Sequence, residues 1–171
     1  HTRIVGSCHT PIQPGVTIRT NTPRLEQLRR DVVALTLSAH QPDRFKPRHD
    51  GSEFERLVDR FDATATMFDN ARPKECPSID TSHPYLRFDA SACITCRRCL
   101  NACEQVQGQF VYDVTGRGAR TSLVFGPGAR FADSDCVSCG ACIDHCPTGA
   151  ISDIDRTGAN AHTEPDRVTD S

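Results

Sequence analysis

Eight of the ten cysteines in this 171-residue chain lie in two short runs, and this placement constrains the fold more than any other feature. Residues 93–103 read CITCRRCLNAC and residues 136–146 read CVSCGACIDHC, so the two runs align without a gap. All four cysteines match, and aliphatic residues recur at two further positions. The repeat predicts a small duplicated domain with pseudo-twofold symmetry.

Each run has the spacing C-x2-C-x2-C-x3-C, and the second is followed by Pro147. This spacing is typical of bacterial ferredoxins, in which three cysteines of a run hold one [4Fe–4S] cluster and the fourth holds the other. Three thiolates spaced in this way wrap one face of a cluster, whereas the fourth lies on the following helical turn and points away. We therefore expect cluster I to bind Cys93, Cys96, Cys99 and Cys146, and cluster II to bind Cys136, Cys139, Cys142 and Cys103.

The chemistry expected of these sites is electron transfer. A cluster with four cysteine ligands leaves no iron open to a substrate, so it accepts and passes one electron. The residues expected to exclude water from the clusters are Phe88, Ile94, Leu100, Val111, Val124, Val137 and Ile143. A zinc ribbon needs neither the third cysteine nor the trailing C-x3-C. A disulfide framework is typical of secreted chains, and because no secretory signal is visible we expect a cytoplasmic protein.

Charge and hydropathy argue against two classes of protein. The 20 Lys and Arg are balanced by 22 Asp and Glu, whereas nucleic-acid-binding domains normally carry a basic excess. The longest apolar stretch, residues 32–35, is far shorter than the roughly 20 residues of a membrane helix. The chain opens on His1 and not on Met, so we expect a fragment or a processed chain.

The sequence predicts an α+β fold in three parts. Residues 80–153 form the cluster domain, residues 1–79 form a mainly helical segment before it, and residues 154–171 form a hydrophilic linker or tail. Residues 1–21 carry β-branched runs typical of a strand-rich unit. Apolar periodicity predicts helices over 23–39 and 53–62, and strands over 86–88, 109–114 and 121–125.

Several motifs accompany the cysteine runs, namely DTSHPYLRFD at 80–89, EQVQG at 104–108, GRG at 116–118 and CPTGA at 146–150. Together they resemble the iron–sulfur region of the alpha subunit of NAD-dependent molybdenum or tungsten formate dehydrogenases. Similar segments occur in the diaphorase small subunit of NAD-reducing hydrogenases and in the large iron–sulfur subunit of respiratory complex I. The resemblance implies a bacterial-ferredoxin-like fold and a relay that carries electrons from formate oxidation towards flavin and NAD.

The resemblance places the other cofactors outside this chain. It implies a partner domain or subunit with a pterin-bound metal, and a diaphorase subunit with FMN and NAD. Residues 116–118 and 126–128 do not complete a dinucleotide-binding G-x-G-x-x-G, and we expect no catalytic site here. Cys8 resembles the last ligand of the family's preceding [2Fe–2S] domain. Its other ligands would lie before His1, so residues 1–79 are expected to be a remnant without that cluster.

The family also often carries a histidine-ligated [4Fe–4S] site that reads His-x3-Cys-x2-Cys-x5-Cys. Here His40 is followed by Arg44, Pro47 and Glu53 at the cysteine positions. We therefore expect this cluster to be missing and His40 to be an ordinary histidine at a helix end. Cys76 matches no family ligand and is expected to be a thiol without a ligand role.

The sequence thus favours an electron-relay part of an oxidoreductase complex resembling formate dehydrogenase. Three alternatives stay open: the diaphorase relay of an NAD-reducing hydrogenase, a stand-alone ferredoxin, and a zinc-binding interaction module. For none of these alternatives do we expect nucleic-acid binding or membrane insertion.

Overall fold

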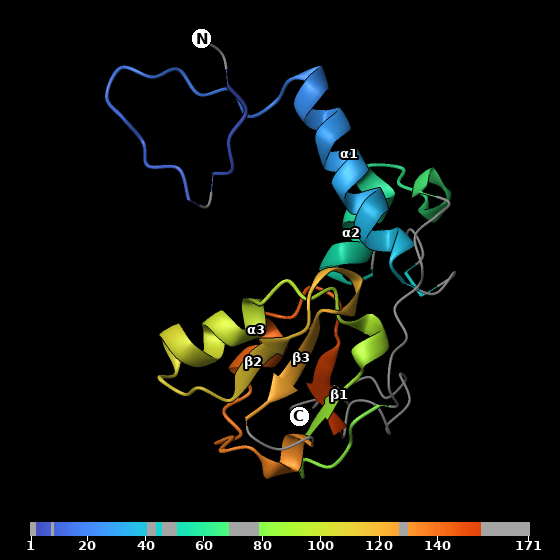
Figure 1. The fold of residues 1–171 in the computed structure, drawn as a ribbon, viewed down its shortest axis with the longest axis vertical. Helices are drawn as coiled ribbons and strands as arrows, with labels where there is room; N and C mark the ends of the chain where they lie inside the picture. Colours follow the sequence, from blue (N-terminus) through green and yellow to red (C-terminus); the bar gives the residue numbers. More distant parts are fainter. Residues whose placement is uncertain are drawn as a thin grey trace, which may run out of the picture.

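The computed structural model describes residues 3–7, 9–40, 44–45, 51–68, 79–126 and 130–154. Figure 1 shows a helical part up to residue 68 and, from residue 79, a domain of short helices and strands. Several residues with sequence-based expectations lie outside this description, among them Cys8, Pro47, Cys76, residues 127–128 and residues 155–171. None of the helices in the described ranges is both long enough and apolar enough to span a bilayer.

The elements follow the mixed helix-and-strand order that the sequence predicts. The α-helices are α1 (Pro23–Ser38), α2 (Glu53–Arg60), α3 (Arg98–Asn101) and α4 (Ala141–Asp144), and a π-helix over Ala102–Val106 continues α3. The strands are β1 (Leu86–Phe88), β2 (Tyr112–Thr115), β3 (Ser122–Phe125) and β4 (Ile151–Asp153). Single 3-10 turns cover Ala65–Phe68, Ala90–Ala92, Gly118–Arg120 and Phe131–Asp133.

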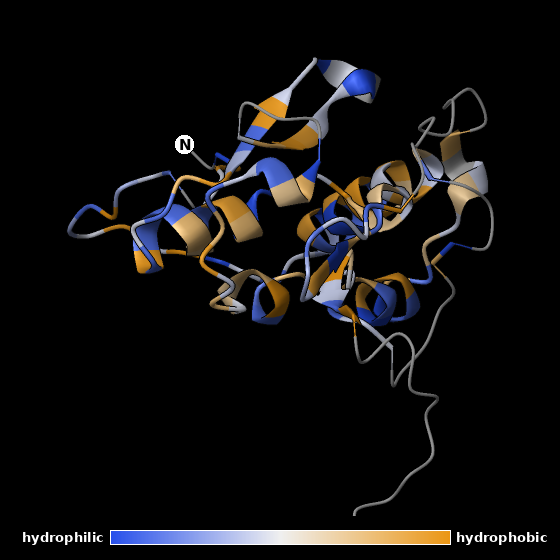
Figure 2. Ribbon diagram, turned by 90° about the horizontal axis from the view of Figure 1, so that it is seen from below, coloured by the Kyte–Doolittle hydropathy of each residue, from blue (hydrophilic) through white to orange (hydrophobic). Residues whose placement is uncertain are grey.

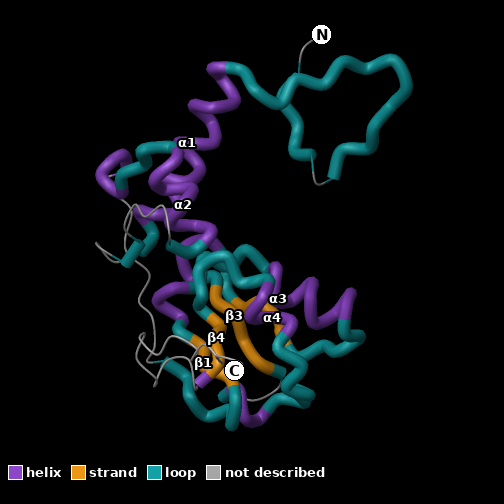
Figure 3. The backbone as a smooth tube through the Cα atoms, turned by 180° about the vertical axis from the view of Figure 1, so that it is seen from behind, coloured by secondary structure: helices purple, strands orange, loops and turns teal. Residues whose placement is uncertain are grey.

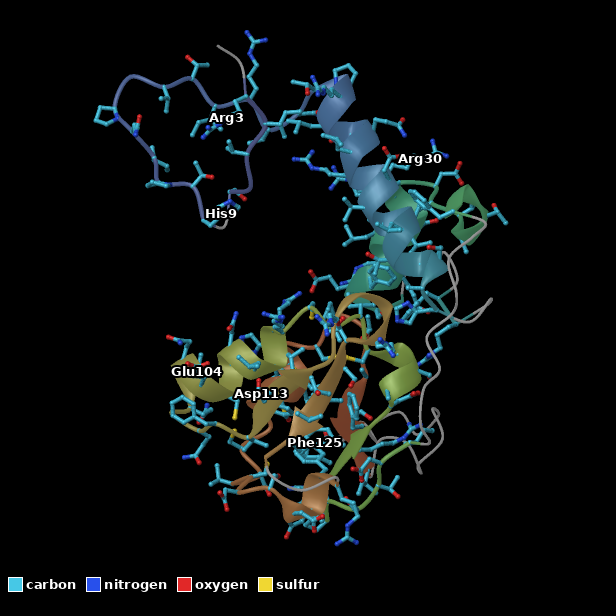
Figure 4. The ribbon with its side chains drawn as sticks, viewed as in Figure 1. Arg3, His9, Arg30, Glu104, Asp113 and Phe125 are labelled. Atoms are coloured by element: carbon cyan, nitrogen blue, oxygen red, sulfur yellow. The ribbon has the colours of Figure 1, made fainter. Side chains whose placement is uncertain are left out.

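Helix α1 begins where the sequence predicts, because its first turn is capped. The Thr22 hydroxyl accepts a hydrogen bond from the Leu25 amide at 3.3 Å, and Pro23 occupies the first helical position. The helix ends at Ser38, one residue before the expected end, and buries Val33 and Leu37. Arg30, labelled in Figure 4, donates to the Asp62 carbonyl at 3.0 Å and so ties α1 to the chain after α2.

The segment before α1 differs from its prediction. In the described residues 3–7 and 9–21 there is no strand, and Figure 1 shows this segment as a wide loop beyond the start of α1. Its apolar side chains are exposed, with Ile12 at 81% and Ile18 at 63%. A β-branched run forms a strand only against a partner strand, and within the described residues these residues have none.

Helix α2 is held at its start by a capping box. The Ser52 hydroxyl accepts from the Glu55 amide at 3.3 Å, and the Glu55 carboxylate accepts from the Ser52 amide at 2.8 Å. The helix ends at Arg60, two residues before the predicted end, and buries Phe54 and Val58. The Phe54 amide donates to the Pro147 carbonyl at 2.9 Å, which joins α2 to the end of the second cysteine run.

Two antiparallel strand pairs organise the domain from residue 79 onward. Strand β1 precedes the first cysteine run and pairs with β4, which lies after the second run. Strand β2 lies after the first run and pairs with β3, which precedes the second. Each pair therefore joins the beginning of one repeat to the end of the other, and helices α3 and α4 pack against each other beside them (Figure 3).

An aromatic core lies between the strand pairs. The rings of Phe125 and Phe131 stack at 4.4 Å, and Phe88 meets Phe125 edge-on at 5.1 Å. Figure 4 shows Phe125 at the end of β3, within the domain. In Figure 2 the longer helices carry both hydrophobic and hydrophilic positions, as expected of helices that bury one face.

Candidate iron–sulfur site

The first cysteine run is shaped by two residues with left-handed backbone. Thr95 has φ +52° and Arg97 has φ +62°, and α3 begins directly after Arg97. These two turns lead the chain around the space beside Cys93 and Cys96 before the helix starts. Cys99 is buried on α3, and Cys103 is buried on the π-helix that continues it.

The second run repeats this backbone. Ser138 has φ +58° and Gly140 has φ +77°, at the positions that align with Thr95 and Arg97. Glycine adopts a positive φ without steric cost, whereas at the aligned position the first run tolerates a strained arginine. Cys142 is buried on α4 in the same way as Cys99 on α3. The duplication seen in the sequence is therefore a duplication of loop geometry as well.

The structure gathers the eight cysteines around two hollows. One hollow is bordered by Cys93, Cys96, Cys99 and Cys146, and the other by Cys103, Cys136, Cys139 and Cys142. In each hollow three cysteines come from one run and the last cysteine comes from the other run. Among the described residues, no three His, Cys, Asp or Glu side chains lie close enough to share a single metal ion.

The cysteine sulfurs of the two hollows are suited to binding a positively charged metal group. Burial, reinforced by the neighbouring thiols, raises the pKa of Cys99 to about 12, and burial raises the pKa of Cys142 to about 11. The pKa of Cys103 is raised by burial as well. Thiols crowded in this way resist forming thiolates together unless a cation offsets their charge. Iron supplies that charge, and cysteine thiolates are the ligands that hold iron–sulfur clusters.

Two histidines contact the cysteine runs and help to hold them in place. The sequence alone does not reveal this role. His40 is buried at the end of α1, where Nδ1 lies 2.9 Å from the Thr36 carbonyl oxygen and Nε2 lies 3.3 Å from that of Cys93. The position at a helix end was predicted, but the link to Cys93 was not. The partners are 53 residues apart, so no local pattern reveals the contact.

His83 acts on the second run. Its Nδ1 accepts from the amides of Tyr85 and Leu86 at 3.2 and 3.1 Å, so the ring proton sits on Nε2, which faces the Ser138 hydroxyl at 3.5 Å. The Ser138 amide in turn lies 3.4 Å from the Cys136 sulfur as a donor. Burial lowers the pKa of His83, which favours this neutral form.

Two residues at the cysteine positions of the family's histidine-ligated site form ion pairs instead. Arg44 pairs with Asp89 at 3.1 Å, just before the first cysteine run. Glu53 pairs with Arg98 at 2.6 Å, inside that run. Their side chains therefore link the helical part to the cluster domain.

The apolar surroundings agree with the prediction in most positions. Phe88 and Val111 are buried, and Ile94, Leu100 and Ile143 pack against the core. Val137 borders the hollow of the second run and is 59% exposed, and its shielding role stays a prediction. On β3 the buried positions are Leu123 and Phe125, one residue either side of the predicted Val124. Tyr112, which lines the hollow of Cys142, was not singled out from the sequence.

Comparison with known proteins places this geometry among iron–sulfur domains. Residues 92–150 match the family described as a 4Fe-4S dicluster domain. The chain is 32% identical over 146 residues to the NADP-reducing hydrogenase subunit HndD of Solidesulfovibrio fructosivorans, covering 85% of this chain and 25% of that protein. It is 28% identical over 152 residues to the mitochondrial NADH-ubiquinone oxidoreductase 78 kDa subunit of Neurospora crassa. That alignment covers 86% of this chain and 20% of that protein.

Two further similarities extend the comparison. A stretch of 37 residues is 46% identical to the candidate formate dehydrogenase YrhE of Bacillus subtilis, covering 20% of this chain and 4% of that protein. The crystal structure of an NAD+-reducing [NiFe]-hydrogenase in the H2-reduced state matches with a TM-score of 0.74 and 26% identity, covering 95% of this chain and 68% of that chain. This chain spans a quarter or less of the length of the curated relatives named above. It therefore carries a ferredoxin-like [4Fe–4S] region and is similar to parts of hydrogenases and of an NADH-ubiquinone oxidoreductase subunit.

Proposed function

We propose that this chain relays single electrons through two [4Fe–4S] clusters. The observation that supports this most directly is the grouping of eight cysteines around two hollows, four to each. The proposed ligands of cluster I are Cys93, Cys96, Cys99 and Cys146, and those of cluster II are Cys136, Cys139, Cys142 and Cys103. Each cluster supplies the one-electron chemistry, and the chain supplies ligands, apolar shielding and hydrogen bonds to sulfur.

The proposed division of the chain reflects this role. Residues 80–153 hold the clusters, and residues 1–79 resemble part of a [2Fe–2S]-type domain with helices that cover the first cysteine run. The contacts of His40 and Glu53 with that run, and of Arg44 with Asp89 just before it, support the covering role. Residues 154–171 serve as a hydrophilic linker or tail.

The expected donor is a formate-oxidising pterin domain or subunit, and the expected acceptor is a flavin and NAD subunit. The short but 46% identical match to a candidate formate dehydrogenase supports formate as the source. A second candidate is the diaphorase relay of a hydrogenase. It is supported by the longer alignment with the hydrogenase subunit, which covers 85% of this chain. The alignment with the formate dehydrogenase covers 20% of it.

Metal and sulfide analysis of the chain, purified without oxygen, tests the relay. Two saturated cubanes predict about eight irons and about eight acid-labile sulfides per chain, with a brown colour that bleaches on reduction. Zinc in place of iron, with a colourless protein, would contradict the proposal and favour the interaction module.

The donor is tested on the native complex that contains this chain. Bleaching by formate, with pterin in the same preparation, supports the formate dehydrogenase assignment. Bleaching by hydrogen and not by formate contradicts it and supports the hydrogenase relay. If the chain purifies alone with both clusters and shuttles electrons between separate enzymes, it is a stand-alone ferredoxin.

A further inference from the structure

Tyr112 is a buried polar side chain without a role in the relay proposed above. It begins β2, is only 6% exposed, and its ring packs against Phe125 and Phe131 at 5.7 and 5.9 Å. Its hydroxyl oxygen is buried from solvent and has no hydrogen-bond partner among the described residues. A buried hydroxyl without a partner is costly, so a partner is expected in the space that it adjoins.

That space is the hollow of the second cysteine run. Tyr112 lines it together with Cys103, Cys136, Cys139 and Cys142. Tyr112 and Cys142 therefore border the same hollow, which is the space that a cluster held by the second run would fill. A phenol is a hydrogen-bond donor, and a thiolate or a sulfide of a cluster is an acceptor.

We propose that the Tyr112 hydroxyl donates a hydrogen bond to the sulfur shell of cluster II, at or next to Cys142, and raises the reduction potential of that cluster. The inference rests on the proposed function. Reduction adds one electron to the cluster and makes its sulfurs more negative, so a donor to sulfur stabilises the reduced form more than the oxidised form.

The Tyr112 hydroxyl affects the reduction potential of cluster II and not that of cluster I. In the hollow of the first run, Ile151 at the start of β4 takes the place that Tyr112 has at the start of β2. Two threonines, Thr95 and Thr148, border that hollow instead of a phenol, and the Thr148 oxygen lies 3.7 Å from the Cys146 sulfur. The phenol therefore biases an electron shared by the pair towards cluster II.

Redox titration of the full chain with its clusters, followed by paramagnetic resonance, tests the inference. Tyr112→Phe removes the oxygen and keeps the ring, and Tyr85→Phe is the matched control at the other tyrosine, which is 65% exposed. The signal of cluster II is identified by its selective loss in Cys139→Ala. We expect Tyr112→Phe to lower the ratio of reduced to oxidised cluster II at a fixed potential by up to about tenfold, a shift of up to about 59 mV. Cluster I in this variant and both clusters in Tyr85→Phe should keep their midpoints.

A second measurement avoids dependence on the folding of Tyr112→Phe. In Tyr85→Phe chains labelled with 3-fluorotyrosine, Tyr112 is the single labelled phenol, and fluorination makes it a stronger donor. The midpoint of cluster II should then rise. An unchanged cluster II midpoint in both experiments, with iron content intact, overturns the role of Tyr112 alone. Absence of iron from the native chain would instead overturn the relay itself.

Discussion

At the scale of single residues, the cysteines are the part of the site that the sequence predicts well. Their spacing is local information, and the repeat of four positions is visible without any structure. The residues that support them are not visible in this way. His40 reaches Cys93 across 53 residues and His83 reaches Ser138 across 55, so their partners are set by the tertiary fold.

His83 gives a pH-dependent prediction for the second run. Burial lowers the pKa of His83 from its ordinary value of 6.5, so the unfolded chain takes up a proton at a pH where the folded chain does not. The contribution of His83 to stability is therefore lost as the pH falls below about 6.5. We expect the chain to lose its brown absorbance faster in this range.

The variant His83→Asn provides the comparison. The asparagine oxygen can accept from the backbone amides that Nδ1 now serves, and the side chain does not titrate. Absorbance decay measured between about pH 5 and 8 should become less dependent on pH in this variant. An equal pH dependence in both proteins would exclude His83 as the source.

At the scale of elements, the bounds are predicted well where a local signal sets them, as at β1 (Leu86–Phe88) and at the start of α1. Helix α1 starts at its predicted residue because the Thr22-Pro23 cap is a local signal. Strand β2 begins at Tyr112 and not at Gln109, because the Gln109 amide bonds back to the Cys103 carbonyl at 2.8 Å. On β3 a continuous apolar run hides which face is buried, which explains the error at Val124.

We expect apolar packing inside the helical part to contribute more to stability than the ion pairs between that part and the cluster domain. Phe54 is buried on α2 and meets the Phe45 ring at 5.0 Å. Phe54→Ala is expected to lower the free energy of unfolding by about 3–5 kcal/mol. The Glu53–Arg98 pair is partly exposed, so Glu53→Gln should cost less than about 1 kcal/mol.

Denaturant unfolding of the two variants checks this ranking. Both changes lie next to each other at the start of α2, but Phe54 packs within the helical part whereas Glu53 pairs with the cluster domain. A loss in Glu53→Gln equal to that in Phe54→Ala would contradict this ranking.

At the scale of the whole molecule, the strands and the cysteines cross between the repeats in the same way. Strand β1 pairs with β4 and β2 pairs with β3, so each sheet joins the two runs. The same exchange brings Cys146 to the hollow of the first run and Cys103 to that of the second. Neither hollow has four cysteines without the other repeat, so loss of one run is expected to damage both sites.

The most direct test of the account is the pair of variants Cys103→Ser and Cys146→Ser, examined by paramagnetic resonance together with iron analysis. The crossed arrangement predicts that Cys103→Ser damages the cluster held by Cys136, Cys139 and Cys142. It predicts that Cys146→Ser damages the cluster held by Cys93, Cys96 and Cys99. If each substitution instead affects only the cluster of its own run, the crossed ligation is contradicted.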